Sequence, residues 1–176
     1  MRSDPSPTDG TPRARLGAHV SGGGGLKTIP SRARSIGCEA VQIFASSPQM
    51  WRPPSAKPDD AAAFRAAVAQ AGLGPIAIHA IYLVNPASED PELREKTARS
   101  LLATLRAADL LGASMVITHL GSARASERAG AIERACDVFA RVLDQYDGAA
   151  SLVFPQAGNR MHAQKGLLAW LLAGRS

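Results

Sequence analysis

Short apolar runs alternate with longer helical segments along most of this chain, and that alternation limits the folds it can adopt. The apolar runs that read as strands cover residues 15–20, 39–45, 75–80, 114–120 and 150–154. The helical segments cover residues 26–37, 59–72, 88–112 and 123–146, and a short last helix is expected over 163–174. A repeated strand–helix–strand pattern predicts parallel strands joined by right-handed crossovers.

The strands are continuous apolar runs without a polar alternation, which predicts that both faces of the sheet are covered. Two architectures fit: an open doubly wound sheet, or part of a (β/α)8 barrel. A complete barrel needs about 250 residues, so this chain of 176 residues has room for about four and a half βα units. Both are α/β folds with parallel strands, and pattern and length leave the choice between them open at this point.

The N-terminal segment and the two cysteines allow further predictions about domain bounds, location and thiol state. Residues 1–14 are polar and proline-rich, which predicts a disordered tail, with one domain over 15–176. The sequence contains neither the apolar core of a signal peptide nor an apolar run of about eighteen residues, so we expect a cytoplasmic protein without membrane contact. Cys38 and Cys136 both lie in apolar segments, which predicts free, buried thiols.

Three histidines are placed at equivalent points of this pattern. His19, His79 and His119 each lie at or near the C-terminal end of a predicted strand. Parallel strands bring these ends to one rim, where α/β folds bind ligands, and imidazole is a good ligand for zinc. A single strand-end histidine is more often a half-buried structural side chain. Three of them at one rim predict a metal or phosphate site.

Two aromatic residues and the net charge are compatible with an anionic partner such as a nucleic acid. Trp51 and Tyr82 follow the second and third strands, where they either stack on nucleic-acid bases or cover the end of the barrel. The formal net charge of +5 favours anionic partners in general.

Four short motifs follow one another along the chain, each at or just after a predicted strand: GAHVSGGGGL (17–26), QIFASSPQMW (42–51), HAIYLVN (79–85) and THLGS (118–122). In sequence and spacing they resemble the endonuclease IV family, which are apurinic/apyrimidinic endonucleases of DNA base-excision repair. The resemblance runs from Leu16 to Leu152, most of the chain after the predicted tail.

The resemblance implies the barrel architecture: the chain would be an α/β fold in the form of a partial (β/α)8 TIM barrel, about four and a half βα units at the N-terminal side of a xylose isomerase-like TIM barrel. The family has three zinc ions at the C-terminal rim of this barrel. The resemblance also implies hydrolysis of the phosphodiester 5′ to abasic sites in double-stranded DNA. His79 and His119 match positions of zinc ligands. Tyr82 matches an aromatic of a loop that enters the minor groove, and Trp51 and Gln49 match the loop after the second strand, where many members have Arg in place of Gln49. His19 matches a residue near the site, and we expect it to contact DNA and do not assign it as a metal ligand.

The sequence also departs from the family. LVFPQAG (152–158) stands where the family has LLENTAG, so Phe154 replaces a glutamate that bridges metals, and the remaining family ligands are not matched. The chain is therefore expected to supply ligands for at most one weakly held zinc ion, and no catalytic residue is assigned. We interpret it as a truncated product, with a frame change near Leu152 as one cause and self-association through exposed barrel edges as a consequence.

Two other functions remain open at this point. One is a sugar isomerase or epimerase of the same barrel superfamily, which would use a divalent metal on strand-end side chains. The other is a non-catalytic remnant that binds DNA without cleaving it.

Overall fold

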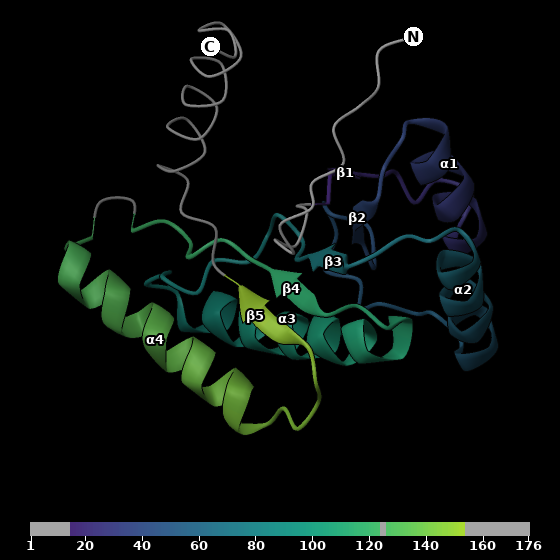
Figure 1. The fold of residues 1–176 in the computed structure, drawn as a ribbon. Helices are drawn as coiled ribbons and strands as arrows, with labels where there is room; N and C mark the ends of the chain where they lie inside the picture. The colour runs from purple at the N-terminus through teal and green to yellow at the C-terminus, as the bar shows by residue number, and fades with distance from the viewer. Residues whose placement is uncertain (1–14, 124–125, 154–176) are drawn as a thin grey trace, which may run out of the picture.

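The computed structural model describes residues 15–123 and 126–153 (Figure 1). The predicted tail over 1–14, the predicted helix over 163–174, and Phe154 therefore lie outside the described residues. The strands are β1 (Gly17–His19), β2 (Ala40–Phe44), β3 (Ile76–His79), β4 (Met115–Ile117) and β5 (Ser151–Val153). The helices are the short 3-10 helix η1 (Leu26–Thr28), α1 (Ile29–Ser35), α2 (Pro58–Gln70), α3 (Pro91–Leu111) and α4 (Arg128–Asp144).

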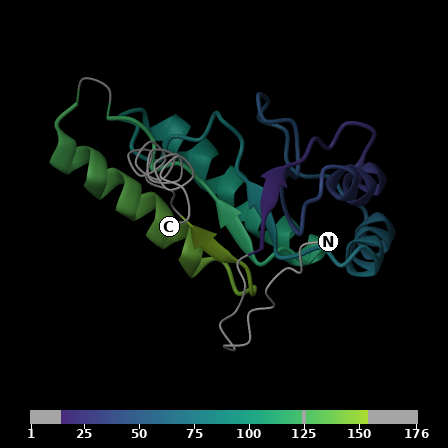
Figure 2. The same ribbon diagram turned by 45° about the horizontal axis from the view of Figure 1, so that its top comes forward.

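The strands form a single sheet in the order β1-β2-β3-β4-β5, and every neighbouring pair is parallel. Figure 2 shows β1 in purple and β5 in yellow-green at the two ends of this row. A doubly wound sheet reverses its strand order at a switch point, whereas a barrel adds each new strand beside the last one. The observed order decides between the two architectures and confirms a partial TIM barrel.

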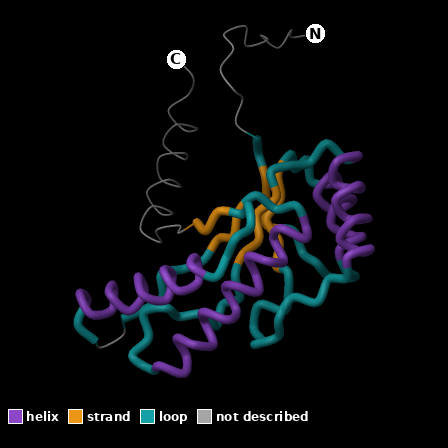
Figure 3. The backbone as a smooth tube through the Cα atoms, turned by 90° about the horizontal axis from the view of Figure 1, so that it is seen from below, coloured by secondary structure: helices purple, strands orange, loops and turns teal. Residues whose placement is uncertain are grey.

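The two faces of the sheet differ in burial. Ile43, Ile78 and Val116 are register partners in adjacent strands, and all three are fully buried, at 0% exposed. They belong to one core with Leu101 and Leu105 of α3. Figure 3 shows the strands gathered together with the helices spread around them.

The opposite face carries Gln42, Phe44, Met115 and Ile117, and these side chains are only half-buried. The prediction that both faces are covered is therefore wrong for the described part of the chain. Side chains on the open face are themselves largely apolar, so the strands read as continuous apolar runs although only one face is packed.

The helix ends show which local signals were interpreted correctly. Gly112, in the left-handed conformation with φ 69°, ends α3 as the sequence predicts. The sequence places the start of this helix at Ser88, but α3 begins at Pro91 and its cap is Asp90, which accepts a hydrogen bond from the Glu92 N–H at 2.9 Å. The Ser88 hydroxyl instead accepts from the Asp90 N–H at 3.2 Å.

The two cysteines differ in their exposure to solvent. Cys38 is buried as expected, but Cys136 is exposed because it lies on the outer side of α4, so that part of the thiol prediction is wrong.

No helix in the described ranges has the length and apolar character that crossing a bilayer requires.

Candidate histidine and aromatic site

The strand register explains why the histidines converge. His19 ends β1, and His79 ends β3 and pairs in register with Ile117 at the end of β4. His119 follows Ile117 by two residues, and residues two apart on an extended segment point to the same face. All three imidazoles therefore lie at the C-terminal ends of the strands, on the open face of the sheet.

The rings come close together, as the sequence predicts. The ring centroids of His79 and His119 are 5.2 Å apart, and those of His19 and His79 are 6.4 Å apart. His79 is half-buried between the other two, which are exposed. His79 is thus the central member of the cluster.

Phe44 and Tyr82 complete an aromatic layer around His79. The Phe44 ring centroid lies 4.5 Å from that of His19 and 5.3 Å from that of His79. Tyr82 contacts both Phe44, at 5.2 Å, and His79, at 5.7 Å, yet remains 58% exposed. The Tyr82 N–H donates to the Pro48 carbonyl at 2.8 Å, which fixes its loop against the loop after β2.

Sequence reasoning missed Phe44. The signal was present, because Phe44 is the last residue of β2 and is the register partner of His79. A continuous apolar run conceals which of its members face the core and which face the rim.

Burial favours a neutral His79, and a hydrogen bond to Ala80 determines which ring nitrogen carries the proton. Its Nδ1 lies 2.6 Å from the Ala80 carbonyl oxygen, so the Nδ1–H donates there and the lone pair is on Nε2. Burial lowers the pKa of His79 and a positive charge on His119 lowers it further, while the Ala80 hydrogen bond acts in the opposite direction. Burial, followed by repulsion from His79, also lowers the pKa of His19. Neutral imidazoles are the form that binds metal ions.

The His79–His119 pair fits part of a zinc site. Two imidazoles that share one tetrahedral zinc ion, with Zn–N bonds of about 2.0–2.1 Å, have ring centroids about 5 Å apart. The observed separation of 5.2 Å agrees with this. Within the described ranges, however, no group of three His, Cys, Asp or Glu side chains lies close enough to hold an ion. The described residues fit two ligands of one ion and do not fit a cluster of ions.

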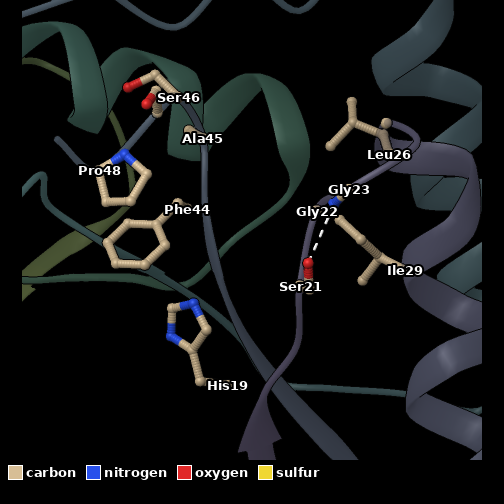
Figure 4. A pocket seen from close by; sticks show the side chains of 12 residues that line it. His19, Ser21, Gly22, Gly23, Leu26, Ile29, Phe44, Ala45, Ser46 and Pro48 are labelled. Atoms are coloured by element: carbon tan, nitrogen blue, oxygen red, sulfur yellow. Dashed lines mark hydrogen bonds between the residues drawn. The ribbon is translucent and has the colours of Figure 1, made fainter. Parts of the chain in front are cut away.

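A cavity of about 580 Å³ opens beside His19 (Figure 4). In that view the side chains of His19, Phe44 and Pro48 lie along one wall, and the glycine-rich loop after β1 lies along the other. Arg32 donates to the Ser21 and Gly23 carbonyls, and the Thr28 hydroxyl lies 2.9 Å from the Gly23 carbonyl oxygen. The loop is thus held in place, and the cavity has the size of a small-molecule site.

The other two residues predicted to contact DNA lie apart from the rings. Gln49 is exposed on the loop after β2, next to Pro48. Trp51 contacts none of the cluster rings in the described structure and instead lines a separate cavity together with residues of α3. The predicted set therefore divides into a histidine centre with Tyr82 beside it and a distinct position for Trp51.

Comparisons with known proteins agree with this architecture. The family model described as "Xylose isomerase-like TIM barrel" matches residues 30–151. The "Probable endonuclease 4" of Methanoculleus marisnigri is 41% identical over 119 residues, which are 68% of this chain and 42% of that protein. The crystal structure of endonuclease IV from Thermus thermophilus matches with a TM-score of 0.67 and 36% identity, covering 80% of this chain and 51% of that one.

A structure of L-ribulose 3-epimerase also matches, with a TM-score of 0.60 and 21% identity over 81% of this chain and 49% of that one, and this likeness concerns the fold alone. The chain spans about half the length of the curated relatives it matches.

Proposed function

The chain belongs to the xylose isomerase-like TIM barrel family as an endonuclease IV-like member, and on that premise we propose that its histidine cluster serves zinc-dependent cleavage of DNA at abasic sites. The observation that carries this proposal is the close His79–His119 pair at the strand ends, with the exposed Tyr82 ring beside it. The rest of the ligand set is not among the described residues.

The imidazoles act as ligands in this proposal. His79 presents Nε2, because the Ala80 carbonyl holds its Nδ1–H, and this hydrogen bond also fixes the orientation of the ring. His119 contributes the second nitrogen from the neighbouring strand end. A zinc ion held there would act as a Lewis acid, stabilising the charge that develops on the scissile phosphate. Phe44 packs against His79 and His19 and keeps both rings at the rim.

Tyr82 and Gln49 would recognise the lesion. Tyr82 is half-exposed on a loop that its own N–H anchors to Pro48, so its ring is available to enter a groove of the duplex. An abasic nucleotide has no base to unstack, so turning it out of the helix costs less than turning out a normal nucleotide. Gln49 lies on the adjoining loop and would contact the same stretch of DNA.

The test is nicking of a duplex that carries one tetrahydrofuran abasic analogue. We expect cleavage on the 5′ side of the analogue in the presence of zinc, none with a chelator, and none in His79→Ala. Tyr82→Ala should weaken cleavage of the analogue while leaving zinc content unchanged. Arg128→Ala, a change at an exposed residue of α4 that makes none of the ring contacts above, serves as the matched control.

Two outcomes would contradict the proposal. Zinc-dependent turnover of a ketose sugar with no nicking would favour an epimerase. Zinc binding that is the same in the wild type and in a His79→Ala, His119→Ala double variant would show that the histidine pair is not the metal site.

A further inference from the structure

A second cavity lies between α3 and the loop after β2. It has a volume of about 450 Å³ and is lined mainly by Trp51, Arg52, Lys96, Arg99, Ser100 and Ala103. The first two residues come from the loop after β2, and the others come from α3. No described histidine lines this cavity, so binding there would not depend on the His79–His119 pair.

The α3 residues form one stripe. Lys96, Arg99, Ser100 and Ala103 follow the i, i+3, i+4, i+7 spacing that places residues on the same helix face. The loop with Trp51 and Arg52 closes this stripe from the other side. The cavity therefore presents an indole ring and three basic side chains to the same space.

Acidic residues near this stripe leave it cationic. Glu95 precedes Arg99 by four residues, but its carboxylate pairs with Arg141 of α4 at 3.2 Å, on the side of α3 that faces α4. Glu92 precedes Lys96 by four residues and is the remaining acid in this part of α3. The described lining contains Arg52, Lys96 and Arg99 and no carboxylate, so the lining carries net positive charge.

The combination of groups matches a nucleotide. Trp51 is 41% exposed, so its ring is accessible to a planar partner, and base stacking on an aromatic side chain tolerates any base. The guanidinium groups of Arg52 and Arg99 have the planar fork that pairs with phosphate oxygens, and Lys96 adds a further point charge. A volume of about 450 Å³ lies within the usual range for small-molecule sites.

We propose that this cavity binds one nucleotide unit, with its base stacked on Trp51 and its phosphate held by Arg52, Lys96 and Arg99. The unit is either a free nucleotide or one nucleotide of a single strand. The proposal goes beyond the function proposed above, because it requires no zinc, no abasic site and no cleavage.

Binding is measured by fluorescence anisotropy of a fluorescein-labelled oligothymidylate of eight nucleotides, with chelator present and without any lesion. We expect Trp51→Ala and Arg99→Glu each to weaken binding about tenfold or more, as loss of one stacked base or a phosphate contact does. Arg128→Glu removes an equal charge from an exposed position on α4 outside the lining and should weaken binding less than about threefold, as a long-range electrostatic effect alone would.

Competition then distinguishes the sources. Displacement by thymidine monophosphate assigns the site to free nucleotides, whereas its failure, with the Trp51 and Arg99 effects retained, assigns it to single strands. The proposal is overturned if both variants bind as tightly as Arg128→Glu. It is also overturned if thymidine monophosphate displaces the oligonucleotide and inorganic phosphate does so at the same concentration, because base stacking would then contribute nothing. Circular dichroism of each variant excludes loss of fold, and a negative result here leaves the nicking assay unaffected.

Discussion

The two faces of the sheet differ in burial and in the roles we assign to them. On the helix-covered face, Ile43, Ile78 and Val116 are fully buried and form a continuous apolar row. On the open face, one residue further along, Phe44 and His79 are half-buried and bring polar and aromatic groups to the rim. Alternate positions of one strand therefore serve stability and ligand binding separately, so changes on one face should leave the other largely intact.

The largest expected effect is on the helix-covered face. Leu105 is fully buried in α3, and Leu105→Ala should lower the free energy of unfolding by about 3 kcal/mol, since it removes packed methyl groups and leaves a cavity. Met115→Ala on the open face should cost less than about 1 kcal/mol, because that side chain is already partly in water.

Urea denaturation of both variants checks this difference. Equal losses would mean that the open face is packed as tightly in solution as the helix-covered face. Trp51 and Tyr82, which lie in loops, are left unchanged in both variants, so intrinsic fluorescence still reports unfolding.

This contrast also marks how far the sequence could be interpreted. The order of strands and helices, the αL stop at Gly112 and the meeting of His79 with His119 all follow from patterns that depend on local sequence and strand direction. The half-buried open face could not be predicted, because apolar residues occupy both faces of each strand. Phe44 is concealed because it ends a continuous apolar run, whereas the Trp51 cavity depends on contacts between separate βα units, which no local pattern encodes.

The second prediction concerns the open face alone. His119→Ala should lower zinc affinity by about tenfold or more, because it removes one of only two candidate ligands among the described residues, whereas His19→Ala should lower it less than about threefold. Competition with a chromophoric chelator measures both values. A larger loss in His19→Ala would reverse the assignment of ligand and neighbour.

A third, smaller effect is expected where β5 is attached to the core. The Tyr146 hydroxyl donates to the Asp109 carboxylate at 2.7 Å and accepts from the Ala150 N–H at 2.8 Å. Tyr146→Phe removes both bonds and should cost about 1 kcal/mol of unfolding free energy, with zinc affinity unchanged. A loss of zinc affinity in this variant would show that the edge strand positions the histidines, and that the two faces are coupled.

The smallest effect is a dependence on pH that belongs to the open face. The pKa values of His19 and His79 are lowered in the folded chain, by burial first, so the unfolded chain binds more protons below about pH 6.5. Their contribution to stability is therefore complete above that pH and is lost as the pH falls through the lowered values. Urea midpoints at pH 7.5 and pH 5, with a metal chelator present, should differ less in His79→Gln than in the wild type.

Leu105→Ala provides the matching test on the other face. Leu105 is apolar and lies in the core, so the variant should be less stable at both pH values by the same amount, because effects at separate sites add. A pH dependence that changed in Leu105→Ala as much as in His79→Gln would mean that opening the core alters the burial of the imidazoles. The two faces would then form one cooperative unit, and the division of work between alternate strand positions would be incorrect.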